Sequence, residues 1–419
     1  MNSHAHLRRR TCLGFALGLA ADAALPRAAG AMPDAGLPGG TYKTILSFGK
    51  HEGRQPGGVV LGSGGLLLGS TEGGGELDLG TVYRLDAHRR VQVLHEFRGG
   101  PDDGAGPAGA PAEGDDGAFY GVTGGGGAEG VGVAWRLGPD ARWTVLHHFG
   151  VAPDNGNGSF DGLLFASDGQ FYGTTVWGGK RDRGLVYRLG KDGTFTPLWH
   201  MGAKDEPYTP RATLIEGADG RLYGSSWGGG PKAGGTIYSL EKDGSDHRVL
   251  YSFVLADGWI PHAALVQATD GLLYGTTRNG GMYARGTAFR LAPDGSGFEL
   301  LHEFGGRADD RYPETPLVEV EPGVFVGAAA GDRDAISMGG ALFALTSDGG
   351  HRNLHRFARR TYHGVPDGEI PTGPMCRLPS GELVGSCAYG GVAQGRNTRG
   401  TLWFARAPDG GWSRRAVSG

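Results

Sequence analysis

The chain has 419 residues, and its 83 glycines argue against long helices, because glycine destabilises a helix interior. A hydrophobic fraction of 39% with 17 Phe, 14 Tyr and 8 Trp excludes a disordered chain, and the glycines follow no collagen-like triplet period. The formal net charge is −4 and basic residues are scattered, which excludes a nucleic-acid-binding protein with a clustered basic face.

The N-terminal segment has the pattern of an export signal. Three arginines at positions 8–10 precede an apolar run, and Ala29 and Ala31 supply the small residues expected before a cleavage site. The run is too short for a stable membrane span, and two of the arginines resemble a twin-arginine signal. We therefore expect residues 1–31 to be a signal peptide, with the twin-arginine route left open. The mature protein should be periplasmic or extracellular, with no membrane span.

A strand that ends in glycine recurs through the rest of the chain. The anchoring glycines are Gly69, Gly121, Gly173, Gly224, Gly275, Gly327 and Gly385. Neighbouring anchors are 51 or 52 residues apart, except for the last, which follows after 58 residues. A period of about fifty residues is typical of propeller blades.

Each repeat contains four predicted strands, which we call a, b, c and d. In the fifth repeat the a strand at residues 264–268 precedes the b strand that ends at Gly275, and strands c and d follow. Asp-Gly pairs connect a to b and often c to d, as expected for tight hairpin turns. We predict one all-β domain over residues 41–419, a seven-bladed β-propeller with four antiparallel strands per blade, closed because a ring leaves few exposed edges.

Two segments compete to complete the last blade. Residues 41–48 resemble a d strand but precede the first a strand, whereas residues 412–417 occupy the d position of repeat seven directly. The sequence leaves open which of them closes the ring. The same repeat contains Cys376 and Cys387, either a disulfide in an oxidising compartment or two small buried side chains.

The repeat pattern is Leu-Tyr-Gly-Thr-Thr, a Gly-Gly pair, Gly-Thr-Val-Tyr-Arg-Leu, Leu-His-x-Phe, Asp-Gly and a loop proline. It resembles the GloVer (Gloeo/Verruco) tandem repeat of exported bacterial proteins, over about residues 41–419. The match is specific in repeats one to five, and it weakens after Gly327 and Gly385. The resemblance implies a secreted, propeller-like protein, and it implies no catalytic residue.

The short a–b and c–d turns lie at one end of the blades, so we expect function among the longer loops at the other end. An acidic residue recurs in the long loop before each a strand: Glu52, Asp103, Asp154, Asp205, Asp257, Asp309 and Asp367. These acids either form a rim that binds cations or sugar hydroxyls, or cap their own turns.

Aromatic residues share these loops, and flat rings beside carboxylates suit stacking on sugars. The predicted ligand-binding residues are Trp177, Trp227, Trp259, Tyr208, Tyr312 and Tyr389. We expect Trp227 and Trp259 to form a wall beside His262. The alternative is that the rings pack beneath their own loops.

Four polar residues near the loop proline differ in type between blades, and they are the candidate catalytic residues Asp161, Arg211, His262 and Glu314. Such a set could supply the acid–base chemistry of a polysaccharide lyase or glycosidase, or the charges could simply pair around the ring. No motif indicates a metal or a cofactor. The histidines of the Leu-His-x-Phe motif recur with the repeat, which indicates packing rather than metal ligation.

We therefore expect an exported, monomeric binding module whose partner is a glycan or another cell-envelope component. A carbohydrate-active enzyme at the channel mouth is the first alternative. A structural envelope protein without a small-molecule site is the second.

Overall fold

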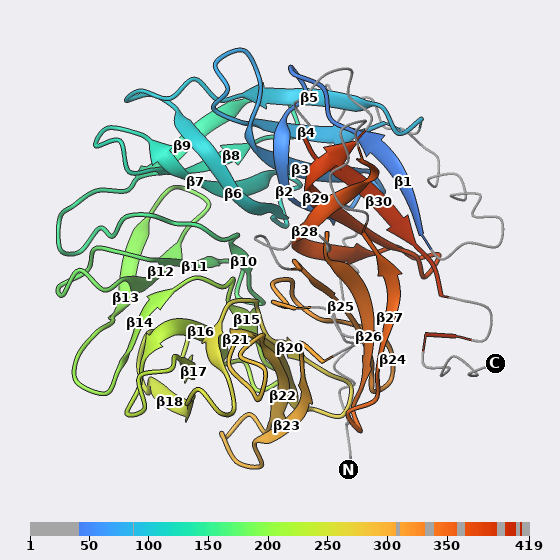
Figure 1. Cartoon of the computed structure of the whole chain (residues 1–419). Coiled ribbons are helices and arrows are strands. Elements are labelled where there is room, and N and C mark those ends of the chain that lie inside the picture. The colour runs from blue at the N-terminus through green and yellow to red at the C-terminus, as the bar shows by residue number, and fades with distance from the viewer. Residues whose placement is uncertain are drawn as a thin grey trace, which may run out of the picture.

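The computed structural model describes residues 42–86, 88–306, 311–331, 339–357, 365–391, 399–407 and 411–412. Its strands form seven antiparallel sheets around a central axis, with the a strands nearest the axis (Figure 1). The described part of the chain contains no helix, and therefore none that could span a membrane. The predicted seven-bladed propeller with four antiparallel strands per blade is confirmed.

Within each of blades one to six the strands follow chain order from the axis outward, and in blades four and five the a strand is split into two short pieces. Blades one to three comprise β2 (Arg54–Leu61), β3 (Leu67–Gly73), β4 (Thr81–Leu85), β5 (Val91–Glu96), β6 (Gly104–Glu113), β7 (Phe119–Gly126), β8 (Val133–Leu137), β9 (Trp143–His148), β10 (Leu164–Phe165), β11 (Phe171–Thr175), β12 (Leu185–Leu189) and β13 (Phe195–His200). Blades four to six comprise β14 (Pro207–Pro210), β15 (Ile215–Glu216), β16 (Leu222–Gly229), β17 (Thr236–Leu240), β18 (Arg248–Ser252), β19 (Trp259–Pro261), β20 (Val266–Gln267), β21 (Leu273–Asn279), β22 (Thr287–Leu291), β23 (Glu299–Glu303), β24 (Val318–Glu321), β25 (Val324–Ala329), β26 (Ala341–Thr346) and β27 (His351–Arg356).

The first strand of the chain closes the ring. Blade seven consists of β28 (Val365–Arg377), β29 (Leu383–Gly391), β30 (Thr401–Ala405) and β1 (Tyr42–Ser47), and β1 pairs antiparallel with β30. In the competing C-terminal segment, Trp412 is buried in the core that it shares with Tyr42, while residues 413–417 lie outside the described part. The N-terminal segment therefore supplies the outer strand of blade seven, over Tyr42–Ser47, and residue 41 lies outside the described part.

A repeated contact between neighbouring blades explains why the repeat needs its glycine and its loop proline. Gly286, just before strand c of blade five, has φ +107°, and a Cβ there would lie 2.6 Å from Cδ of Pro313 in blade six. The backbone N–H of Tyr312 donates to the carbonyl of Arg285, 2.8 Å away. The equivalent N–H donates across every blade junction, and the donors are Gln55, Gly106, Gly158, Thr209, Ile260, Tyr312 and Ile370. We call this contact of glycine, proline and backbone hydrogen bond at a blade junction the lock. It holds the start of each a strand beside the axis.

The motif histidines are packing residues, as predicted. His95 stacks on Trp143 of the next blade with ring centres 3.6 Å apart, and His147 stacks on Phe195 at 4.1 Å. The two cysteines of blade seven, Cys376 and Cys387, are buried free thiols, so the disulfide interpretation does not hold.

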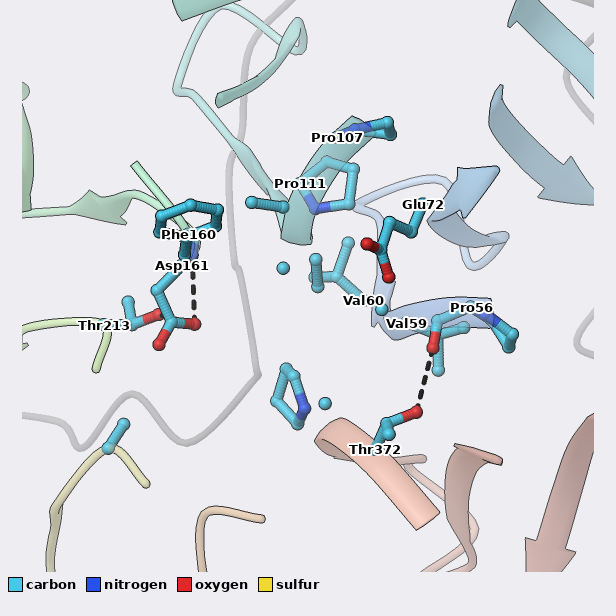
Figure 2. A pocket seen from close by; sticks show the side chains of 18 of the residues that line it. Pro56, Val59, Val60, Glu72, Pro107, Pro111, Phe160, Asp161, Thr213 and Thr372 are labelled. Atoms are coloured by element: carbon cyan, nitrogen blue, oxygen red, sulfur yellow. Dashed lines mark hydrogen bonds between the residues drawn. The ribbon is translucent and has the colours of Figure 1, made fainter. Parts of the chain in front are cut away.

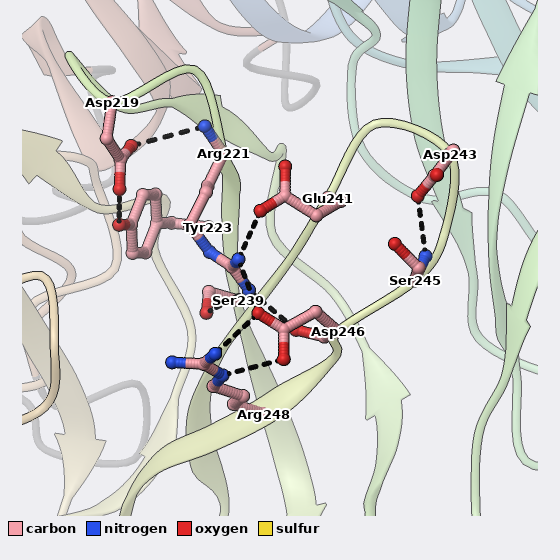
Figure 3. A network of polar contacts seen from close by, with 9 residues as sticks. All are labelled: Asp219, Arg221, Tyr223, Ser239, Glu241, Asp243, Ser245, Asp246 and Arg248. Atoms are coloured by element: carbon pink, nitrogen blue, oxygen red, sulfur yellow. Dashed lines mark hydrogen bonds and ion pairs between the residues drawn. The ribbon is translucent and has the colours of Figure 1, made fainter.

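The face with the short turns pairs its charges internally. Figure 3 shows Arg221 of blade four among Glu241, Ser239 and Asp246, to whose carboxylate it donates at 2.9 Å. On the same face the Tyr223 hydroxyl donates to Asp219, in the preceding turn, at 2.7 Å. These groups satisfy one another and leave the opposite face as the place for a site.

Candidate functional site

A cavity of about 1110 Å³ lies along the propeller axis and is lined by residues around the a strands of all seven blades. Figure 2 shows Phe160 and Asp161 on one side of it and Val60 and Glu72 on the other. Because Glu72 and Tyr389 belong to the b strands where these enter the long loops, the cavity reaches the long-loop face.

One residue from each blade forms what we call the entrance ring. Each member directly follows the loop proline, or Ser159 in blade three, and lines the cavity: Gly57, Ala108, Phe160, Arg211, His262, Glu314 and Thr372. The large side chains come from four consecutive blades, three to six. Blades seven, one and two contribute only threonine, glycine and alanine, and this smaller half of the ring leaves the space that the cavity occupies.

Aromatic and basic side chains alternate along the large half of the ring. The Arg211 guanidinium carbon lies 4.7 Å from the ring centre of Phe160 and 4.3 Å from that of Trp227. The Trp227 ring in turn lies 5.2 Å from the His262 ring. We call Phe160, Arg211, Trp227, His262 and Glu314 the polar arc.

Glu314 at the end of the polar arc is held in an ion pair. Its carboxylate is 8% exposed and accepts from Arg278 Nε at 2.6 Å, and Arg278 also lies over the ring of Tyr312. The interpretation that charges pair around the ring therefore holds here. Arg211, in contrast, forms no direct ion pair with any residue that the structure describes, although its charge interacts with that of Asp161.

Asp161 is a half-buried carboxyl group next to the arc. Its Oδ1 accepts from the Thr213 hydroxyl at 3.1 Å and from the Gly162 amide at 3.2 Å. Burial raises the pKa of Asp161 to about 6, against the opposing effect of these bonds and of the Arg211 charge. Burial also lowers the pKa of His262, so this imidazole is neutral at pH 7.

The cavity collects all four candidate catalytic residues, Asp161, Arg211, His262 and Glu314. Of the predicted ligand-binding aromatics, Tyr389 lines the cavity, and its hydroxyl accepts from Gln55 at 2.8 Å.

The other predicted aromatics lie around the cavity rather than in its lining. Trp227 lies beside His262, as expected, and also packs against Arg211, whereas Trp259 makes no ring contact with His262 among the described residues. Ile260 between them has φ +58°, which redirects the chain, and the Trp259 ring is 36% exposed.

The remaining three rings, Trp177, Tyr208 and Tyr312, also lie outside the cavity lining. Trp177 is 45% exposed and meets Phe160 edge to face at 5.4 Å. Tyr208 packs under Arg183 at 4.9 Å, and Tyr312 is covered by two arginines.

Three of the described loop acids cap their turns: Glu52, Asp103 and Asp257, which accepts from the amide of Val254 at 2.9 Å. Asp154 instead lies 3.2 Å from His200 Nε2, and in the fourth loop Glu206, not Asp205, accepts from the amide of Ala203. Asp103 accepts from the amides of Arg98 and Gly104, and Glu52 accepts from the amide of Gly49. Asp309 and the side chain of Asp367 lie outside the described residues. Among the described residues, no cluster of three or more His, Cys, Asp or Glu could hold a metal ion.

Sequence reasoning missed Arg278 and Glu72. Both are the third residue after an anchoring glycine, the position that Trp227 takes after Gly224. Comparing this position between repeats would have found them.

A family model described as the Gloeobacter/Verrucomicrobia repeat matches residues 28–217, 143–336 and 202–403. No curated protein sequence matches the chain.

Among solved structures, an oligogalacturonate lyase from Vibrio parahaemolyticus is similar at 13% identity and a TM-score of 0.50, over 88% of this chain and 97% of that one. A gluconolactonase from Xanthomonas campestris is similar at 14% identity and a TM-score of 0.42, over 74% and 86% of the two chains. At such identities the likeness concerns the fold alone.

Proposed function

We propose that in this protein, a member of the Gloeobacter/Verrucomicrobia repeat family, the axial cavity binds a glycan. The glycan would enter the cavity from the long-loop face. The observation that carries this proposal is the lopsided entrance ring, with a polar arc on one side and open space on the other. A volume of about 1110 Å³ is large for a single small molecule and suits an oligosaccharide.

The groups on the cavity wall match the chemistry of a sugar. Hydroxyl groups both donate and accept, and the wall offers Arg211 as a donor, Glu72 as an acceptor and neutral His262 as both. The Phe160 ring, 39% exposed, supplies an apolar surface for a pyranose face, and Trp177 extends that surface outward.

Catalysis is the second candidate, because one observation favours it. Asp161, with a pKa of about 6, is partly protonated near neutral pH, as a general acid needs to be, and it lines the same cavity as His262. A carbohydrate-active enzyme would show turnover that falls with Asp161→Asn, whereas a binding module would show none.

We also propose that the protein is exported and meets its ligand in the cell envelope or outside the cell. The support is the signal pattern of residues 1–31, which lie outside the described part of the chain.

A cavity-filling variant tests the binding proposal. Ala264 lines the cavity two residues after His262, so Ala264→Trp should fill space without removing any polar group. The matched control is Ala256→Trp, at an exposed position on a long loop of the same blade.

Wild-type protein is first screened on a glycan array, and the best ligands are then measured by calorimetry. Ala264→Trp should weaken binding at least tenfold, roughly 1.4 kcal/mol, and Ala256→Trp should not. Equal affinities for wild-type protein and Ala264→Trp, or no glycan bound across the array, would contradict the proposal.

A further inference from the structure

Arg211 differs from Arg278 and Arg221 because it forms no direct ion pair with a described residue, although the charge of Asp161 acts on it. Arg278, on the neighbouring blade, is bonded to Glu314, and Arg221, on the opposite face, is bonded to Asp246. Arg211 makes no ion pair with a described residue, although it is half-buried in the cavity wall. A buried charge is costly unless it is paired, so a partner from outside the chain would complete this site.

Two aromatic rings orient the guanidinium. Phe160 and Trp227 lie 4.7 and 4.3 Å from its central carbon. Cation–π contacts stabilise a cation over a ring face, while the N–H donors of a guanidinium point outward in its own plane. With the rings holding it, the planar fork of donors remains available to a ligand in the cavity.

We propose that Arg211 binds the carboxylate of an acidic saccharide, so that the ligand is a uronate-containing glycan; this inference rests on the proposed function. A guanidinium fork matches the two oxygens of a carboxylate and holds them by paired, charge-assisted hydrogen bonds. The small half of the entrance ring, with Gly57, Ala108 and Thr372, leaves the sugar ring room to lie opposite.

The surroundings favour a singly charged anion. Arg211 is a single cation whose charge interacts with the Asp161 carboxyl group, and Glu314, which lines the same cavity, is already neutralised by Arg278. A phosphate dianion usually requires several donors and cations, which the described wall does not gather around Arg211.

The first test uses wild-type protein and needs no variant. Calorimetry compares trimers of galacturonate, glucuronate and mannuronate with their methyl esters, with the neutral hexose trimers and with a sulfated galactose trimer. At least one uronate should bind about 10- to 100-fold more tightly than its ester, as expected for loss of a charge-assisted hydrogen-bonded pair. Equal binding of acid and ester, or tighter binding of the sulfated trimer, overturns the inference.

The second test removes the guanidinium. Arg211→Met keeps much of the side-chain packing between the two rings, and it should abolish the preference for the uronate over its ester, so that the acid loses at least tenfold more affinity than the ester does. The control is Arg183→Met, which removes an exposed arginine that lies over Tyr208 on the same face but outside the cavity lining.

The failures of the two proposals are distinguishable. Binding of neutral trimers with no preference for the acid removes the role of Arg211 and leaves the glycan proposal intact. Absence of binding to every saccharide removes both. An equal loss of uronate binding in Arg211→Met and Arg183→Met also contradicts a specific role for Arg211.

Discussion

The carboxyl group of Asp161 should destabilise the folded protein at neutral pH, and Asp161→Asn should therefore be more stable than wild type. Its pKa is raised from 3.8 to about 6, mainly by burial. The folded state then binds the proton more tightly than the unfolded chain, so the free energy of unfolding falls as pH rises from about 4 to about 6. A shift of about two units is worth at most about 3 kcal/mol. An asparagine at this position can still accept from Thr213 and Gly162.

Urea denaturation at several pH values between 4 and 7.5 measures this effect. Asp161→Asn should exceed wild type in free energy of unfolding by up to about 3 kcal/mol above pH 6, and the two should converge near pH 4. A difference that does not depend on pH, or a less stable variant at pH 7, would refute the reasoning.

Asp103 provides a control of opposite sign. Burial opposes its ionisation, but hydrogen bonds from His95 and from the amides of Arg98 and Gly104 lower its pKa overall. Its folded-state pKa lies below the unfolded value, so its contribution to stability is present above the unfolded pKa and is lost as pH falls through the folded one. Asp103→Asn should therefore lose stability at pH 7, where Asp161→Asn gains it.

Two further predictions concern the blade junctions and export. Gly286→Ala should cost roughly 1–3 kcal/mol more than Gly220→Ala in urea denaturation. Both glycines have positive φ, but only Gly286 is crowded, by Cδ of Pro313 in the next blade and by the Thr277 carbonyl oxygen in its own blade. Equal losses would contradict the lock. N-terminal sequencing of exported protein should find that residues 1–31 are absent, and Arg9→Lys/Arg10→Lys should retain the precursor in the cytoplasm if the twin-arginine route is used; an intact Met1 on exported protein would contradict cleavage.

The propeller was predictable because each repeating residue type meets a requirement of the strand or turn in which it lies. The anchoring glycines leave room for an aromatic ring of the paired c strand, as Gly69 does for Tyr83, whereas the Asp-Gly turns and the glycine before each c strand satisfy backbone geometry. These requirements recur along the chain, so the spacing of the residues reveals the architecture. Ring closure remained open because two terminal segments had similar strand patterns. One signal could have decided it, since the buried Phe48 corresponds to the phenylalanine after the d strand in other blades, such as Phe97 and Phe149, and residues 412–419 contain none.

The candidate site was only partly predictable, for a geometric reason. The residue after the loop proline, or after Ser159 in blade three, lines the cavity in every blade, so Arg211, His262 and Glu314 could be chosen by position alone. Trp259, three residues before His262, could not be placed, because the left-handed φ of Ile260 redirects the chain between them. Side-chain direction before a locked proline depends on a contact with the neighbouring blade, which no local pattern encodes.

The contrast between the lock and the entrance ring is itself an argument for a ligand. The two lie next to each other in sequence and experience the same blade geometry. The proline of the lock recurs in every blade except blade three, which has Ser159, because the proline packs against the glycine of the preceding blade, such as Gly286. The following residue varies from glycine to arginine and faces the cavity. If this position served only to close the ring, the same type of side chain would suit it in each blade. The variation in side chain between blades is better explained by a bound molecule that lacks the sevenfold symmetry.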